Sequence, residues 1–144
     1  MVKKRVLAFG KFDGLHLGHL YYLEQAKKFG EELTVVIARD KRIQETKGKK
    51  PVLKEKERKK LVQTLKPVDK TVLGKETGNV FEILKKIKPE VIVLGYDQKP
   101  SNKKIQEEIK KMNLKAKVAR IKAFNSKRFK SSKLKKEIIK RENC

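Results

Sequence analysis

Short apolar runs alternate along the chain with longer stretches of mixed character. Residues 6–9, 33–38 and 91–94 are apolar almost throughout. Because these runs do not alternate between apolar and polar positions, they are typical of strands in a parallel sheet that is covered by helices on both faces. Weaker runs at residues 71–73 and 116–121 predict two further strands.

The stretches between these runs carry helical patterns. Leu20, Leu23 and Ala26 recur at helical spacing within residues 18–29, and Gly30 is expected to end that helix. Further helices are predicted over residues 54–65, 79–87, 102–112 and 131–141. The expected capping residues are Asn79, Ser101 or Asn102, and Ser131 or Ser132. The residues expected to face inward are Leu61, Leu65, Phe81, Leu84, Ile87, Leu134, Ile138 and Ile139.

Strands and helices thus alternate along the whole chain. This order predicts an α/β fold, a single doubly wound Rossmann-like domain over residues 1–144 with a mostly five-stranded parallel sheet. Ligands of such sheets bind beyond the carboxyl ends of the strands. Residues 10–19, 39–51 and 95–98 each follow a predicted strand, so we expect them to meet at that edge. The chain has neither G-x-G-x-x-G after the first strand nor G-x-x-x-x-G-K-[ST], so neither a dehydrogenase-type coenzyme site nor a P-loop is indicated.

The only two histidines of the chain, His16 and His19, lie three residues apart where the first helix is expected to begin. This spacing puts both rings on one helix face, and a helix N-terminus attracts phosphate. Two neutral imidazoles can donate hydrogen bonds to a phosphate whose charge rises in a transition state. Gly18, between them, lets a ligand come close. A zinc pair and a purely structural role remain alternatives, and Cys144 is the only other obvious soft ligand.

Composition places few further limits on function. No apolar run approaches the roughly 20 residues of a membrane span, and one cysteine allows no internal disulfide, so a cytoplasmic protein is expected. Lys and Arg total 40 against 17 Asp and Glu, a net charge of +23. Such a charge attracts phosphorylated molecules. Because the lysines are spread along the chain and there is no tryptophan, nucleic acid is expected to bind only nonspecifically.

The block Phe12-Asp13-x-x-His16-x-Gly18-His19 resembles the first signature of the H-x-G-H nucleotidyltransferase superfamily. Further blocks at residues 36–40, 48–52, 65–69 and 93–98 resemble most the small archaeal FAD synthases, which adenylylate FMN. The resemblance implies an enzyme that transfers AMP from ATP to FMN and releases diphosphate. The alternative within the superfamily is an adenylyl- or cytidylyltransferase acting on glycerol 3-phosphate, heptose phosphate or another phosphorylated metabolite.

The resemblance also implies roles for single residues. His16 and His19 are the implied catalytic residues, in contact with the triphosphate and the transition state. The implied nucleotide-binding residues are Gly10, Lys11, Phe12, Asp13, His16, Leu17, Gly18, His19, Asp97, Phe124, Ser131 and Ser132. The candidate phosphate clamps are Lys47, Lys49 and Arg58. Each also has a plainer interpretation: Asp97 and Asp13 as turn residues, the serines as helix caps, and the basic residues as solvated charges.

Three positions depart from the family pattern. Lys11 stands where threonine is common, Leu17 where proline is frequent, and Phe124 where tyrosine is expected. The implied substrates are ATP, with CTP as the alternative, and FMN. A divalent cation, Mg²⁺ or Mn²⁺, is expected to arrive with the nucleotide, and Asp13 is a candidate to support it. A homodimer is left open.

Overall fold

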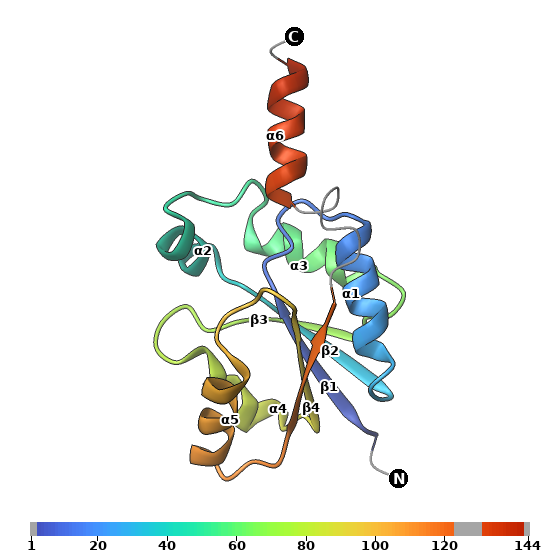
Figure 1. Ribbon diagram of the computed structural model, residues 1–144, viewed down its shortest axis with the longest axis vertical. Coiled ribbons are helices and arrows are strands. Elements are labelled where there is room, and N and C mark those ends of the chain that lie inside the picture. Colours follow the sequence, from blue (N-terminus) through green and yellow to red (C-terminus); the bar gives the residue numbers. More distant parts are fainter. Residues whose placement is uncertain (1–2, 123–130, 143–144) are drawn as a thin grey trace.

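Five parallel strands form one sheet in the order β3-β2-β1-β4-β5 (Figure 1). The computed structural model describes residues 3–122 and 131–142, and in the last helix only the side chains of residues 135–140. The strands are β1 (Arg5–Gly10), β2 (Glu32–Ile37), β3 (Lys70–Leu73), β4 (Val91–Gly95) and β5 (Lys117–Ile121). The helices are α1 (Leu17–Lys27), α2 (Asp40–Lys47), α3 (Glu55–Gln63), the 3₁₀ turn η1 (Val80–Glu82), α4 (Ile83–Ile87), α5 (Asn102–Lys111) and α6 (Ser131–Glu142). The predicted doubly wound α/β fold and five-stranded parallel sheet are confirmed.

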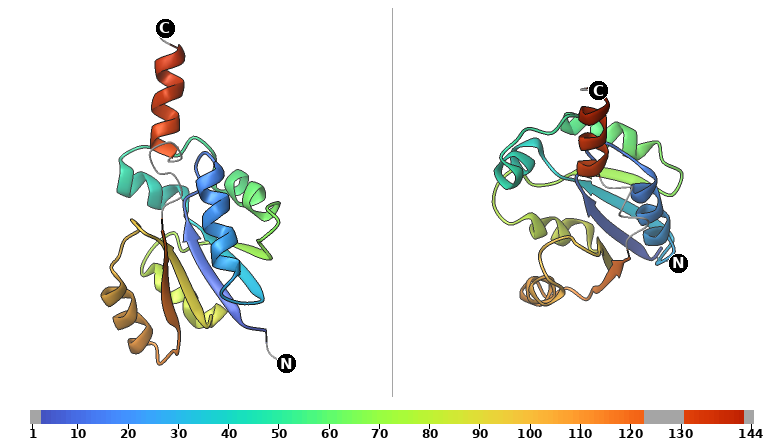
Figure 2. Two further views of the ribbon diagram at one scale, coloured as in Figure 1. Left: turned by 45° about the vertical axis from the view of Figure 1, so that its right-hand side comes forward. Right: turned by 45° about the horizontal axis from the view of Figure 1, so that its top comes forward.

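Both faces of the sheet are covered, and this explains the continuous apolar runs. In β1, Val6 and Ala8 pack into the core on the side of α1 and α3, while Leu7 packs into the core on the side of α4 and α5. Figure 2 shows these two helical layers on either side of the sheet. Side chains of successive strand residues point to opposite faces, so a strand buried on both sides must be apolar at every position.

Most predicted helices begin where their capping residues indicated. The Asn79 side chain accepts a hydrogen bond from the Phe81 amide at 2.9 Å, and the Ser101 hydroxyl accepts one from the Lys104 amide at 3.3 Å. These bonds satisfy amides that have no partner in the first turn. Residues 79–87 form η1 followed by the short α4 rather than one continuous helix.

Three expectations for the first half of the chain were wrong. Residues 40–47 form helix α2, whose one buried residue is Ile43, where a connecting segment was expected. Leu61 is exposed, and α3 instead buries Arg58 and Val62. Helix α1 ends at Lys27 with Lys28 as its C-cap, so Gly30 lies beyond the helix end rather than terminating it. A Cβ atom there would lie 2.6 Å from the Lys4 carbonyl oxygen, so this glycine allows close approach of the chain to the start of β1.

Helix α6 projects from the carboxyl edge of the sheet (Figure 1). Its extent agrees with the predicted last helix, but the expected inward orientation of Ile138 and Ile139 was wrong, because each is 60% exposed. Leu134 falls among the residues whose side chains are not described. Among the described residues, no helix is long and apolar enough to span a membrane.

Candidate active site

The two central strands part at their carboxyl ends. β1 and β4 pair from Val6↔Val91 to Ala8↔Val93 and no further. The Tyr22 hydroxyl lies 3.0 Å from both the Phe9 and Val93 carbonyl oxygens, and the Gln98 amide nitrogen donates to the Phe9 carbonyl oxygen at 3.1 Å. These two side chains replace the sheet hydrogen bonds that end here. The parting lies at the point where chain connections leave the sheet in opposite directions, where α/β folds bind ligands.

The two histidines lie together where α1 begins. His16 is the N-cap residue, and its Nδ1 accepts a hydrogen bond from the Gly18 amide at 3.0 Å. His19 Nδ1 accepts one from the His16 amide at 3.2 Å, which completes a reciprocal cap. The two rings stack with 3.9 Å between their centroids. The prediction that both rings share one side of the turn is confirmed, although His16 caps the helix rather than lying within it.

These contacts determine the protonation state of both rings. Burial, and to a smaller extent the neighbouring His16, lower the pKa of His19 to about 4. Burial also lowers the pKa of His16. Both rings are therefore neutral near pH 7. Because each Nδ1 accepts a backbone N–H, the single ring proton must lie on Nε2. Each of the two stacked rings thus carries one Nε2–H donor.

Phe12 packs against this turn from the core of the protein. Its ring is buried, lies 5.4 Å from the His19 ring between centroids, and covers Gly10 so closely that a Cβ at residue 10 would be 2.4 Å from it. Phe12 also has a positive φ of 56°. Its side chain is therefore part of the core, and only the backbone of Phe12 is available to contact a nucleotide. Leu17 is 54% exposed at the first helical position, where the neighbouring Gly18 amide is bonded to His16.

Asp13 joins three segments. Its carboxylate accepts hydrogen bonds from the Val52 amide at 2.9 Å and the Leu53 amide at 2.8 Å, and it pairs with Lys135 Nζ at 2.5 Å. Burial alone would raise the pKa of Asp13, but the bonds from Lys135 and the two amides lower it. The carboxylate is thus engaged by protein groups, which agrees with the plainer interpretation that it orients the turn.

Two charged groups from other elements influence Lys11. Burial lowers its pKa, and Lys47 at the end of α2 lowers it further, while Asp97 after β4 raises it. Arg58 donates to both the Lys11 carbonyl and the Asp40 carboxylate, and Gln98 donates to the Phe9 carbonyl, so the segments that follow β1, β2 and β4 meet at this edge as expected. Lys47, Lys49 and Asp97 are exposed on the segments that border the parting of the strands.

Arg58 has a different environment from the one expected. It is fully buried, and its guanidinium donates to the Leu53 carbonyl at 3.0 Å, the Lys11 carbonyl at 2.7 Å and the Asp40 carboxylate at 2.6 Å. A phosphate clamp needs a guanidinium that faces the ligand. The geometry therefore corrects the predicted clamp, and Arg58 instead joins α3 to α2 and to the turn after β1.

Some predicted residues cannot be placed. Phe124 lies outside the described residues, and Ser131 and Ser132 are described only as the backbone that opens α6. Conversely, the sequence interpretation missed Tyr22, Gln98 and Arg120 as residues that shape this edge. Gln98 is the last residue of the block at residues 93–98, which is the one available signal for it. Nothing in the sequence pattern points to Tyr22 or Arg120.

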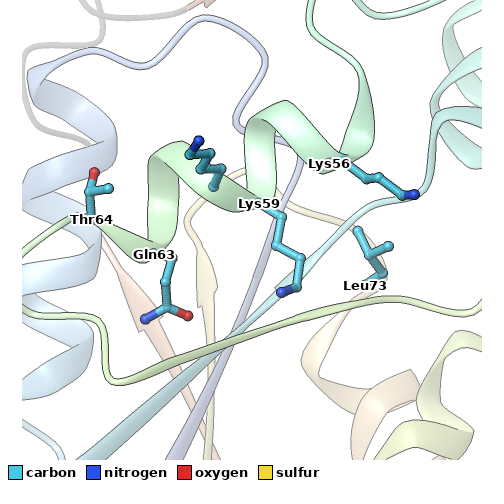
Figure 3. Close-up of a pocket in the computed structure, with 6 residues that line it drawn as sticks. Lys56, Lys59, Gln63, Thr64 and Leu73 are labelled. Atoms are coloured by element: carbon cyan, nitrogen blue, oxygen red, sulfur yellow. The ribbon is translucent and has the colours of Figure 1, made fainter.

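A separate hollow is lined by residues of α3, its C-cap residue and a residue of β3 (Figure 3). The residues that line it are Lys56, Lys59, Lys60, Gln63, Thr64 and Leu73. None of them was predicted to bind the nucleotide, so this hollow is not the candidate site. Among the described residues, no three His, Cys, Asp or Glu side chains gather so that they could hold a metal ion, and the zinc interpretation of the histidine pair gains no support.

Comparison with known proteins decides the family. The Cytidylyltransferase-like family profile matches residues 7–137. This chain belongs to the cytidylyltransferase-like family. Its relatives include a protein named FAD synthase from Thermococcus sibiricus, 42% identical over 95% of this chain and 93% of the relative. Another protein named FAD synthase, from Methanohalobium evestigatum, is 50% identical over 81% of this chain and 76% of the relative. The resemblance found in the sequence is thus confirmed.

A solved structure supports the fold of this cytidylyltransferase-like chain. A Thermoplasma volcanium protein, described as a lipopolysaccharide core biosynthesis protein, superposes with a TM-score of 0.81 at 42% identity. The match covers 86% of this chain and all of that chain. Thermotoga maritima TmcAL, solved with alpha-thio ATP, shares the fold at 12% identity and a TM-score of 0.68.

Proposed function

We propose that this chain is an FAD synthase, an adenylyltransferase that transfers AMP from ATP to FMN and releases diphosphate. The observation that carries the proposal is the stacked pair of neutral histidines at the opening of α1, each of which bonds a backbone amide through Nδ1 and so keeps its proton on Nε2. The relatives named FAD synthase supply the acceptor, because no described contact by itself distinguishes a flavin from another phosphorylated molecule.

The reaction needs no general base. An oxygen of the FMN phosphate, already ionised at pH 7, attacks the α-phosphorus of ATP. The new P–O bond forms as the bond between the α-phosphorus and the bridging oxygen breaks, and diphosphate leaves with that electron pair. Catalysis then consists of positioning and of stabilising the charge that develops on the phosphoryl oxygens. Two uncharged donors are suited to this because their hydrogen bonds strengthen as charge accumulates.

The remaining residues divide into those that meet the nucleotide and those that position others. Lys11 and Lys47 are close enough to influence each other and form the basic side of the site, with Lys49 as a further clamp. Asp97 binds the ribose or base end of ATP. Arg58 and Asp13 are positioning residues, because protein groups engage both.

The last helix supplies the other side of the site. Ser131 and Ser132 open α6, where backbone N–H groups can hold the β- and γ-phosphates. The ion pair between Lys135 and Asp13 places this helix beside the turn that carries the histidines. Phe124 is the proposed aromatic contact. A divalent cation enters with ATP as part of the substrate, and residues 1–144 act as one domain.

A pyrophosphate-release assay tests the assignment. ATP and CTP are each offered with FMN, glycerol 3-phosphate and heptose phosphate in the presence of Mg²⁺. The proposal expects release with ATP and FMN. Release with CTP and glycerol phosphate, and none with FMN, would move the assignment to the alternative acceptor class.

A further inference from the structure

Arg120 holds the loop that follows β4. It lies on β5 beside Leu94, and its guanidinium donates to the carbonyl oxygens of Gly95 at 2.9 Å and Gln98 at 2.6 Å. It also donates to the carbonyl oxygen of Pro100 at 2.6 Å and to the side chain of Asn102 at 2.6 Å. One side chain thus hydrogen-bonds to three carbonyls of a single loop and to the first residue of α5. Charged donors make the stronger hydrogen bonds in proteins.

The same loop reaches across to β1. Gln98 accepts the Gly95 amide at 2.6 Å with its side-chain oxygen and donates to the Phe9 carbonyl at 3.1 Å with its nitrogen. Asp97, which lies between Gly95 and Gln98 in the sequence, is close enough to Lys11 to raise the pKa of that lysine. The loop is therefore bonded to Arg120 on β5 and to the end of β1, and Asp97 belongs to the segment that these bonds hold.

We propose that Arg120 is a positioning residue for the nucleotide: by gathering the carbonyls of residues 95, 98 and 100 it holds Asp97 over the parting of β1 and β4. The inference rests on the proposed function, because it takes Asp97 as a nucleotide contact. Arg120 itself touches protein groups, and its effect on ATP passes through the loop. Lysine, a point charge with one nitrogen, cannot reproduce the bonds of a planar guanidinium.

The loop itself provides a readout that requires no substrate. Amide hydrogen exchange at residues 95–101 is measured without ligand in the wild type, Arg120→Met, Arg120→Lys and the control Arg5→Met. Arg5 is a matched control because it also lies on a strand and donates to a carbonyl, that of Ile87 at 2.8 Å, but at the opposite edge of the sheet. Arg120→Met should speed exchange at Gly95 and Gln98 by about tenfold or more, the factor that corresponds to losing a hydrogen bond to a charged group. Arg5→Met should leave exchange at these residues unchanged. Equal exchange in all four proteins would contradict the role of Arg120 in holding the loop.

Kinetics then test the route to ATP. Arg120→Met should raise the KM for ATP about tenfold with kcat reduced by less than about threefold, Arg120→Lys should lie between, and Arg5→Met should match the wild type. In a double-mutant cycle with Asp97→Asn, the two effects on KM should not multiply, because Arg120 acts through Asp97. Multiplying effects, or an Asp97→Asn variant with normal KM, would overturn the proposal. Failure of the wild type to make FAD is a separate result that concerns the proposed function alone.

Discussion

His16 and His19 stack face to face, and each ring uses Nδ1 to accept a backbone amide of the turn that begins α1. The same two side chains therefore cap a helix and present two Nε2–H donors. Substitution can separate these roles, because asparagine is a good N-cap residue and glutamine at the third helical position can accept the N-cap amide.

We expect His16→Asn and His19→Gln each to lower kcat by about 10²–10³-fold, the loss typical of removing one donor to a developing negative charge. The KM for ATP should change much less, because the lost hydrogen bond is stronger in the transition state than in the ground state. Steady-state kinetics with ATP and FMN measure both constants.

Thermal unfolding provides the control for these variants. Because both retain the cap, their stability should stay within about 1 kcal/mol of the wild type, whereas His16→Ala should lose about 1 kcal/mol more. Normal turnover in His16→Asn and His19→Gln would show that the histidines serve only to begin the helix.

The buried His19 should make stability depend on pH. Its pKa is lowered to about 4 in the folded protein, below the ordinary value of 6.5, so the unfolded chain binds the proton more readily between these values. The contribution of neutral His19 to the free energy of unfolding is fully present above pH 6.5. It is lost as the pH falls toward 4, by up to about 3 kcal/mol at 1.36 kcal/mol per pKa unit. Urea unfolding at pH 7.5 and 4.5 measures this. His19→Gln should show a smaller drop between the two pH values, and an identical drop would assign the dependence to other groups.

Substitution of Arg58 should lower the free energy of unfolding, because Arg58 bonds protein groups rather than substrate. Arg58→Met leaves the Lys11 and Leu53 carbonyls and the Asp40 carboxylate without their donor, and we expect a loss of about 3 kcal/mol in the free energy of unfolding. The lower end of the usual range applies because the Asp40 side chain is 37% exposed. Lys70→Met, which removes an exposed ion pair with Glu32, should lose less than about 1 kcal/mol. Equal losses in the two variants would contradict the role given to Arg58.

Asp13 should control the segment that leads into α3. Asp13→Asn keeps one acceptor oxygen but places an amide NH₂ against one of the Val52 and Leu53 amides, so the segment should open about tenfold more readily. Trypsin cleavage after Lys49 reports that opening, and Pro51 blocks cleavage after Lys50. Lys135→Met keeps both amide bonds and serves as the matched variant, since it removes only the tie to α6. Faster cleavage in Lys135→Met than in Asp13→Asn would show that α6, rather than Asp13, holds the segment.

The sequence predicted the sheet well because buried parallel strands leave a continuous apolar record. It did not predict α2, since residues 40–47 bury only Ile43 and give no helical period. It also misjudged Ile138 and Ile139, because apolar spacing indicates a face but not whether anything covers it.

The chemistry of the site divides in the same way. The H-x-G-H spacing sufficed to place both histidines at a helix start. The burial of Arg58 could not be predicted, because a lone arginine in a charged helix resembles its solvated neighbours. Arg120 and Tyr22 act on carbonyls of segments remote in sequence, a relationship that only the fold creates.

The most direct test follows the α-phosphorus. The purified protein is incubated with FMN, Mg²⁺ and ATP labelled at the α-phosphorus, and the flavins are separated by chromatography. The account predicts label in FAD and none in the released diphosphate. Flavin that remains unlabelled FMN, while the same protein transfers the label to glycerol phosphate or a sugar phosphate, would contradict it.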